Sequence, residues 1–291
     1  MKFVITGSLG NISKPLAQSL LAAGHQVTVI SSQPERAKDI EALGAVAAIG
    51  SIDDVAFLTR TFTGADAIYT MVPPHYTTTD YRAYYNQAAQ VYIDAIKASG
   101  VKQVVNLSSI GAHLPDGTGP IKGLHDLEGA FNTLEDVAIV HLRAGNFYTN
   151  FYGNVAMIKQ AGILGANYPA STAIVMVHPA DIADTAATIM QQPITGKSVR
   201  YVASEELTAE AATCLLGAAI GKPELPWVAF SDEQALEGML QAGLSEELAR
   251  NYVEMGQAVK NGILWENYQQ HKPELSPRKF ADFAKEFALS F

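Results

Sequence analysis

The sequence predicts an α/β fold: a doubly wound, mainly parallel sheet with helices on both faces, and a smaller, mainly helical C-terminal lobe. Two observations predict the sheet. Short apolar segments rich in β-branched residues alternate with segments of helical periodicity, and a glycine turn joins the first strand to the first helix. Helical periodicity of the last third predicts the lobe. We therefore expect one domain over 1–150, further core elements at about 173–203, and the lobe over 204–291.

The first six strands are expected where short apolar runs end in turn residues. The first spans 2–6, and Ile12, Leu16 and Leu20 then mark the first helix by their spacing. A cap at 51–54 opens the third helix, and Gly100 closes the fourth. The other strands are expected at 26–30, 46–49, 67–71, 103–107 and 138–143, and the other helices at 34–43, about 54–62, 78–99 and 124–134.

After residue 143 the alternation of strands and helices is looser. Residues 145–148 are expected to form a loop and 199–203 one more strand. Neither repeats nor a flexible linker separate the two parts, so the lobe is expected to pack against the sheet. Helices are expected at 179–190, 208–220, 232–240, 246–261 and 278–287.

Composition limits the classes of function. Hydrophobic residues make up 48% of the 291 residues and charged residues 17%, so a large buried core is expected. The formal charge of −9, without a run of Lys or Arg, argues against binding to nucleic acid. No apolar run is long enough to cross a membrane, and no cleavable leader is expected. The single cysteine, Cys214, is expected in the core, permits no internal disulfide and fits a reducing, cytoplasmic location.

The turn after the first strand is the most informative stretch. Gly7 and Gly10 lie where strand becomes helix, in the pattern Gly-x-x-Gly-x-x-Ser that ends at Ser13. Glycine lets the backbone bend sharply and approach an anion, and the free N–H groups and dipole of the helix favour a pyrophosphate there. The turn therefore predicts a dinucleotide phosphate site, although an ordinary strand-to-helix turn that binds nothing has the same outline.

The end of the second strand bears on the choice of cofactor. In NAD-binding proteins an acidic residue at this place takes the ribose 2′-hydroxyl and would repel a 2′-phosphate. This chain has Ser31 and Ser32 there, and Arg36 one turn into the next helix. Two hydroxyls and a guanidinium suit a phosphate, so NADP(H) is predicted in preference to NAD(H). The structural alternatives are turn roles for the serines and a surface ion pair between Arg36 and Glu35.

The carboxyl ends of the next strands supply further candidates, because open α/β sheets bind ligands at these ends. Ser51 and Ile52 follow the third strand and are candidates to line the adenine. Val72 and Pro73 follow the fourth strand and are expected to cross the ribose region of the cofactor. Ser108 ends the fifth strand.

No complete catalytic motif accompanies this predicted site. Short-chain dehydrogenases normally have Tyr-x-x-x-Lys after the fifth strand, and this chain has Lys122-Gly-Leu-His125 in that region. His125 is a candidate acid, although a lone histidine at a helix start is more often structural. The histidines and the cysteine show no metal-binding spacing and no Gly-x-Ser-x-Gly is present, so neither a metal centre nor a serine hydrolase is expected.

Three stretches together resemble the NmrA-like branch of atypical short-chain dehydrogenases: 4–13, 141–150 and 177–183. The resemblance spans the whole chain and implies a Rossmann-type fold. It also implies either NADPH-dependent quinone reduction or binding of NADP(H) without turnover. That family commonly lacks the catalytic tyrosine, as this chain does. It often has a third glycine where Ser13 stands, an arginine where Ser32 stands, and a lysine near His125.

The resemblance also implies roles for particular residues. Arg143 and Asp181 match family motifs, for which internal ion pairs are the simpler explanation. Independently of the resemblance, Tyr148 is the second candidate catalytic residue beside His125. The aromatic side chains of Phe147, Tyr148, Phe151 and Tyr152 are candidates for the acceptor pocket or, equally, for the hinge between the lobes. Gly7, Leu9, Gly10, Asn11 and Ile12 would hold the pyrophosphate, Ser31, Ser32 and Arg36 the 2′-phosphate, and Met71, Val72, Pro73, Ser108, Asn146 and Phe147 the nicotinamide half.

We therefore expect an NADPH-dependent oxidoreductase that transfers a hydride to a quinone-like or other small apolar acceptor. Reduction of a quinone leaves a phenolate-like oxygen with a pKa of about 10, which water can protonate without a dedicated acid. The alternative is a non-catalytic NADP(H) sensor that engages a protein partner, and a weaker one is a sugar-nucleotide epimerase. A monomer or a homodimer is expected.

Overall fold

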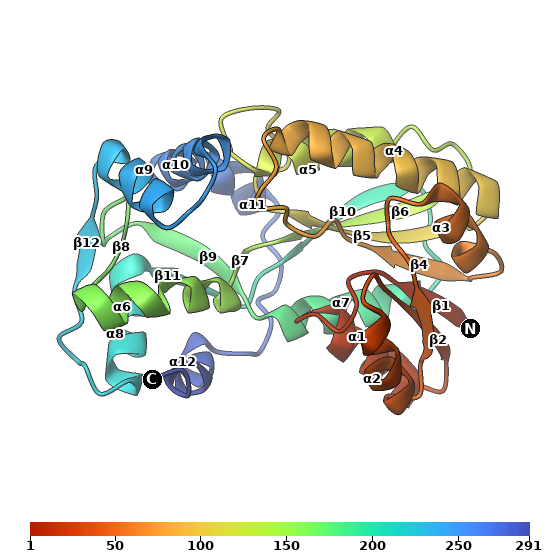
Figure 1. Ribbon diagram of the computed structural model, residues 1–291, viewed down its shortest axis with the longest axis horizontal. Coiled ribbons are helices and arrows are strands. Elements are labelled where there is room, and N and C mark those ends of the chain that lie inside the picture. The colour runs from red at the N-terminus through yellow and green to blue at the C-terminus, as the bar shows by residue number, and fades with distance from the viewer.

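The computed structural model describes all 291 residues. Its centre is a seven-stranded sheet in the order β10-β6-β5-β4-β1-β2-β3, in which every neighbouring pair is parallel (Figure 1). The predicted doubly wound, parallel sheet is confirmed. Its strands are β1 (Lys2–Ile5), β2 (Gln26–Ser31), β3 (Val46–Ile49), β4 (Ala67–Thr70), β5 (Gln103–Ser109), β6 (Ala138–Ala144) and β10 (Lys197–Val202).

Helices cover both faces of this sheet, and each face has its own apolar core. Successive side chains of a strand point to opposite faces, so Phe3 and Ile5 of β1 enter one core and Val4 enters the other. The first core is covered by α1 (Ser13–Ala22), α2 (Ala37–Ala42, after a 3₁₀ turn at Pro34–Arg36) and α7 (Pro179–Met190). The second is covered by α3 (Val55–Phe62), α4 (Tyr81–Ser99) and α5 (Ile121–Phe131).

Helix ends follow local capping chemistry. Asp54 accepts a hydrogen bond from the Phe57 N–H at the start of α3, and Asp80 does the same for Ala83 at the start of α4. Gly100 ends α4 in the left-handed conformation, with φ of 75°. The cap predicted at 51–54 is therefore supplied by its last residue.

The second lobe contains helices joined by two small sheets. β9 (Ala173–Val177) lies between β7 (Asn146–Phe147) and β11 (Glu205–Thr208), and β8 (Leu164–Ala166) pairs with β12 (Trp227–Ala229). The prediction of a loop over 145–148 is wrong at β7, because residues 146–147 pair with β9. The lobe's helices are α6 (Val155–Ala161), α8 (Ala209–Ala219), α9 (Asp232–Gln241), α10 (Glu246–Asn261), α11 (Glu266–Gln270) and α12 (Phe280–Ala288), with 3₁₀ turns at Tyr148–Asn154 and Ile263–Trp265.

The chain enters the lobe before it completes the central sheet. It leaves β6, forms β7 to β9, and returns through α7 to β10 at the edge of the sheet (Figure 1). The division into a domain over 1–150 and a lobe over 204–291 remains a proposal. Because β7, β8 and β9 belong to the two small sheets, we add these strands to the lobe. Cys214 was expected in the core, but its side chain on α8 is exposed. No helix is long and apolar enough to span a membrane.

Candidate active site

The turn between β1 and α1 has a backbone that only glycine adopts without strain. Gly7 has φ of +91°, and a Cβ placed there would lie 2.6 Å from Ser13 Oγ and 3.2 Å from Met71 Sδ. Ser13 is held in that place because its hydroxyl donates to the Thr6 carbonyl at 2.7 Å. The third small residue of the motif therefore packs helix against strand, as the sequence pattern predicts.

This turn also presents unused hydrogen-bond donors. The Gly10 N–H donates to the Gly7 carbonyl at 3.1 Å, whereas the N–H groups of Leu9, Asn11 and Ile12 donate to no protein acceptor. Helix α1 has no side-chain cap and no acidic residue in its first turn. Free donors at a helix N-terminus bind phosphate oxygens, so the residues present fit the pyrophosphate of a dinucleotide.

Ser31, at the end of β2, is placed beside this turn but is largely engaged by the protein. Its Oγ accepts from the Ser8 hydroxyl at 3.0 Å and from the Gln33 N–H at 3.2 Å, and the residue is 3% exposed. Ser8 itself has a left-handed backbone, with φ of 55°. The Ser31 hydroxyl thus links the glycine turn to the second strand.

Ser32 and Arg36 are the exposed candidates for a 2′-phosphate. The Arg36 guanidinium lies 3.4 Å from an Asp39 carboxylate oxygen and 3.4 Å from Gln33 Oε1. Its surface partner is therefore Asp39, rather than the Glu35 considered from the sequence. Such an exposed pair is weak, so Arg36 remains able to turn towards a phosphate.

Ser51 and Ile52 follow β3, whose end lies next to that of β2. The Gly50 N–H donates to the Ser31 carbonyl at 2.9 Å. The Ser51 hydroxyl forms a local turn with Asp53, at 3.0 Å, and Ile52 packs against the second core. Both residues lie beside the predicted 2′-phosphate residues, as expected for the adenosine end of a dinucleotide.

The segment after β4 connects the turn to a large cavity. The Met71 N–H donates to Thr6 Oγ1 at 2.9 Å, and the Met71 carbonyl accepts from the Tyr92 hydroxyl at 2.8 Å. The Pro73 carbonyl accepts from the Tyr84 hydroxyl at 2.9 Å. These bonds fix the backbone over 71–73, and Met71 and Val72 line the cavity.

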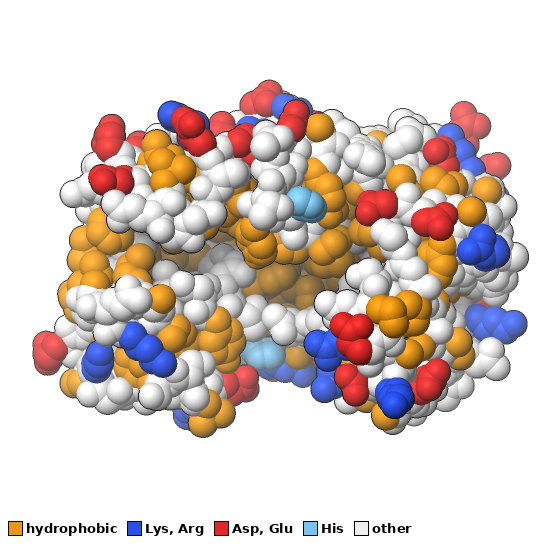
Figure 2. All heavy atoms as spheres, viewed as in Figure 1, with side chains coloured by type: hydrophobic (Ala, Val, Ile, Leu, Met, Phe, Trp, Pro, Cys, Tyr) orange, Lys and Arg blue, Asp and Glu red, His pale blue; other side chains and the backbone are white.

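The cavity lies between the two lobes, where β4, β5 and β6 end, and has a volume of about 1040 Å³. Figure 2 shows the hollow from one side, with mostly hydrophobic side chains on its visible walls. Glu237 is the one charged residue in the lining, which contains no Lys, Arg or His. The lining also contains many aromatic and sulfur-containing side chains: Tyr76, Tyr81, Tyr85, Tyr168, Phe230, Tyr252, Trp265, Met157, Met239 and Met255.

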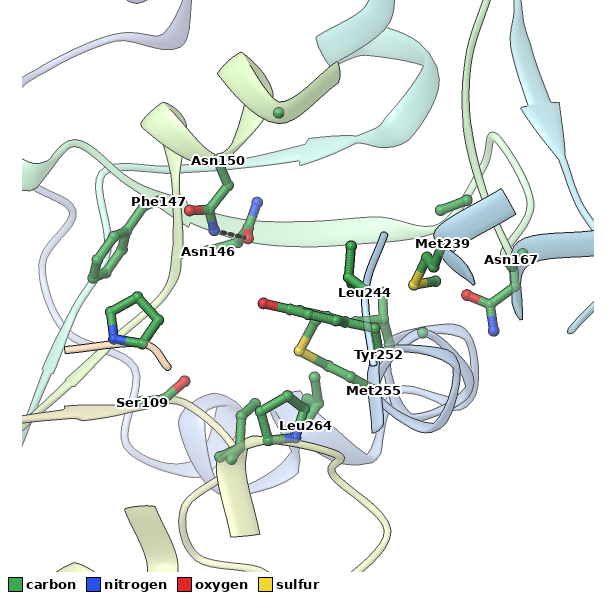
Figure 3. A pocket seen from close by; sticks show the side chains of 18 of the residues that line it. Ser109, Asn146, Phe147, Asn150, Asn167, Met239, Leu244, Tyr252, Met255 and Leu264 are labelled. Carbon is green, nitrogen blue, oxygen red and sulfur yellow. Dashed lines mark hydrogen bonds between the residues drawn. The ribbon is translucent and has the colours of Figure 1, made fainter. Parts of the chain in front are cut away.

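A few neutral polar groups line the cavity. Asn146 and Asn150 lie together, with the Asn150 amide donating to Asn146 Oδ1 at 2.8 Å, beside Phe147 (Figure 3). Ser109 lies across the cavity from them. An apolar cavity with a few neutral hydrogen-bonding groups suits an uncharged ligand that carries one or two oxygens.

A buried ion pair between Glu128 and Arg143 lies next to Ser108 of the cavity lining. The Ser108 hydroxyl donates to Glu128 Oε1 at 2.5 Å, and Arg143 Nη2 lies 2.6 Å from Glu128 Oε2. Burial is the largest single influence on the pKa of Arg143 and would lower it, but the hydrogen bonds and charge of Glu128, together with Tyr201, raise the pKa overall. Asp181 likewise pairs with Arg278. Arg143 and Asp181 therefore each form an ion pair, which was the simpler explanation for these two residues. Ser108 lines the cavity, but its hydroxyl points to Glu128 of the buried pair.

The structure does not place His125 or Tyr148, the two predicted catalytic residues, at the cavity. His125 Nδ1 lies 2.9 Å from the Ala112 carbonyl, which fixes the ring away from the lining. Tyr148 is fully buried in the lobe, where its hydroxyl donates to the Arg278 carbonyl at 3.1 Å and its ring lies 5.0 Å from that of Phe280. Both side chains have structural partners, so the two catalytic assignments remain predictions that this geometry does not favour.

Sequence reasoning missed several polar residues of the cavity lining, among them Ser109, Asn150 and Tyr252. Ser109 was within reach, because it is the last residue of β5 and follows Ser108. Tyr252 lies on α10, where its spacing from Leu248, Met255 and Val259 is that of one helix face. Such a pattern indicates only packing unless the position of α10 over the strand ends is known.

Comparison with known proteins agrees with this geometry. Residues 7–138 match the family model described as NAD(P)H-binding. This part of the chain therefore resembles NAD(P)H-binding domains, and the whole chain has a Rossmann-type fold, as predicted. No curated protein sequence matches the chain.

Among solved structures, an NADPH-dependent quinone oxidoreductase from Escherichia coli, complexed with NADPH, has a TM-score of 0.81 at 20% identity, over 98% of this chain and 99% of that one. A triphenylmethane reductase from a Citrobacter species has a TM-score of 0.81 at 20% identity, over 99% and 100%. A nucleoside-diphosphate-sugar epimerase from Staphylococcus aureus has a TM-score of 0.78 at 14% identity, over 98% and 100%.

Proposed function

We propose that this protein is an NADPH-dependent reductase that transfers a hydride to a quinone-like, flat and apolar acceptor. The observation that carries the proposal is the cavity at the ends of β4, β5 and β6, which has no cationic residue in its lining. Met71 lies between this cavity and the glycine turn, so a dinucleotide bound at the turn would reach the cavity with its nicotinamide end. Two similar structures are of proteins named as reductases of a quinone and of a dye.

The residues of the chain would position the two reactants. Leu9, Asn11 and Ile12 would bind the pyrophosphate with their N–H groups, and residues 71–73 would support the nicotinamide half, with Asn146 beside it. Bound NADPH would supply the hydride. The apolar walls would exclude water and hold the acceptor flat against the nicotinamide.

A quinone suits this site because the site lacks the usual acid. Neither His125 nor Lys122 faces the cavity: His125 contacts the Ala112 carbonyl, and Lys122 lies 3.5 Å from Glu254. An alkoxide needs a strong proton donor, whereas the phenolate-like product of quinone reduction has a pKa of about 10 and can take its proton from water.

The cavity disfavours the sugar-nucleotide alternative. A sugar nucleotide carries a diphosphate, and proteins bind such groups with Arg, Lys or helix N-termini. The cavity lining has no Lys, Arg or His, and its one charged residue is Glu237, which would repel the diphosphate. The cavity of this chain therefore suits an uncharged acceptor better than a sugar nucleotide.

A non-catalytic NADP(H) sensor is the second candidate, and one observation favours it. The region where short-chain dehydrogenases have Tyr-x-x-x-Lys contributes no ionisable side chain to the cavity, because His125 and Lys122 are held elsewhere. In that case the cleft would bind the nucleotide without turnover, and a protein partner would read the bound state.

Turnover separates the two candidates. We expect NADPH oxidation, followed by absorbance at the nicotinamide band, in the presence of 1,4-naphthoquinone or 9,10-phenanthrenequinone. Simple ketones are expected to give no oxidation above the rate without protein. Tight NADPH binding with no turnover on any acceptor would support the sensor, and failure to bind either nucleotide would reject both candidates.

Preference for NADPH over NADH is proposed to depend on Arg36. We expect Arg36→Ala to weaken NADPH binding by roughly 5- to 20-fold and to leave NADH binding unchanged, because a charge-assisted hydrogen bond contributes about 1.5–3 kcal/mol and the site is open to solvent. Titration of nicotinamide fluorescence measures both constants. Arg60→Ala, an exposed arginine on α3, is the matched control and should change neither. Equal effects of Arg36→Ala on the two nucleotides would contradict the assignment.

A further inference from the structure

Tyr252 is one of five tyrosines in the cavity lining, with Tyr76, Tyr81, Tyr85 and Tyr168. It lies on α10, in the second lobe, and Figure 3 shows its hydroxyl reaching into the cavity between the Asn146–Asn150 pair and Ser109. Tyr92, Tyr148 and Tyr268 are fully buried outside this lining. Their hydroxyls donate to the carbonyls of Met71 and Arg278 and to the carboxylate of Glu206. The Tyr252 hydroxyl makes no hydrogen bond with the protein.

Tyr252 is partly buried, and its hydroxyl is open to the cavity. A ligand oxygen in the cavity can therefore take the place of water as the acceptor of its hydrogen bond. The Tyr252 ring packs against the second core on its other side, so the side chain is supported in this orientation. Met255 and Leu244 lie near the ring in the cavity wall and offer no strong acceptor (Figure 3).

We propose that Tyr252 donates a hydrogen bond to the oxygen of the acceptor, and that the substrate class is therefore uncharged quinones rather than oxygen-free ring systems. This inference rests on the proposed reductase function and deepens it. The donor comes from α10, outside the region where short-chain dehydrogenases have their tyrosine. As the acceptor is reduced, its oxygen gains negative charge, and the hydrogen bond from Tyr252 becomes stronger.

The electrostatic surroundings keep Tyr252 a donor. Burial, followed by the neighbouring hydroxyls of Tyr81 and Tyr76, raises its pKa to about 12. The phenol is therefore protonated at neutral pH and does not compete as an anion with the acceptor. Asn146 and Asn150 supply further neutral polar groups in the same cavity.

The test compares two ligands of the same shape. Binding of 1,4-naphthoquinone and of naphthalene is measured by equilibrium dialysis in the presence of saturating NADP⁺, so that no turnover occurs. All variants carry Cys214→Ser, because this exposed thiol would react with quinones. We expect Tyr252→Phe to weaken naphthoquinone binding by about 3- to 10-fold, the range of one neutral hydrogen bond, and to leave naphthalene binding unchanged.

Tyr152→Phe is the matched control, since Tyr152 is 38% exposed and lies outside the cavity lining; it should change neither constant. Loss of both ligands in Tyr252→Phe, or an unchanged preference for the quinone, would overturn the role of Tyr252. The NADPH oxidation assay then still decides the reductase function by itself. If the parent protein binds neither ligand, the acceptor site is wrong and the Tyr252 proposal with it.

Discussion

Gly7→Ala is expected to weaken NADPH binding by about 100-fold or more. The added Cβ would lie 2.6 Å from Ser13 Oγ, on a backbone with φ of +91°. Relief of this overlap must move α1 or the turn, and the free N–H groups of Leu9 and Asn11 move with it. Two hydrogen bonds to a charged group, at about 1.5–3 kcal/mol each, account for a loss of this size. Nicotinamide fluorescence titration measures the affinity.

Gly24→Ala is the control that separates the effect of backbone strain from the effect of the steric clash in Gly7→Ala. Gly24 has φ of +82°, and a Cβ there meets nothing within 4 Å. This variant should therefore lose about 1–2 kcal/mol of unfolding free energy, the cost of a left-handed residue, and keep its NADPH affinity. Equal NADPH affinities of the two variants would contradict the pyrophosphate assignment.

Glu128→Ala is expected to lower the free energy of unfolding by about 3–5 kcal/mol. The glutamate is 5% exposed and holds Arg143 by two hydrogen bonds, at 3.0 and 2.6 Å. Its removal leaves the Arg143 charge buried and unpaired, and an uncompensated buried charge is more costly than the loss of the pair as a whole. Denaturation by urea, followed by circular dichroism, measures the change.

Two further variants make this test specific. Glu246→Ala removes an exposed partner of Arg250 on α10 and should cost less than about 1 kcal/mol. Glu128→Met combined with Arg143→Met should be more stable than Glu128→Ala, because neither charge is then left alone. If Glu128→Ala and Glu246→Ala cost the same, the buried pair does not have the role assigned to it.

The sheet and its cofactor turn were predictable from sequence because both depend on local signals. Alternating strands and helices, the caps at 51–54 and Gly100, and the glycines of the first turn act over a few residues. The small strands were not predictable. β7 is two residues long, and its pairing with β9 joins segments well apart in the sequence.

The catalytic residues were harder to predict because their environment is tertiary. His125 and Tyr148 have the right side chains in the right part of the chain, but their partners are Ala112 and Arg278. No local pattern encodes these contacts. Tyr252 shows the converse: its helical spacing indicates packing, and only the position of α10 in the fold turns its hydroxyl into the cavity.

The excursion of the chain between β6 and β10 has a consequence for folding kinetics. β10 pairs with β6 in register from Lys197 to Val202, but residues 145–196 lie between the two strands in the sequence. Part of this intervening segment belongs to the other lobe. Closing so long a loop is entropically costly and slows formation of the last strand pair. Until then β6, with its Ile-Val-His-Leu sequence, presents an open edge that can pair with another chain. Aggregation during refolding should therefore depend on how quickly β10 reaches that edge.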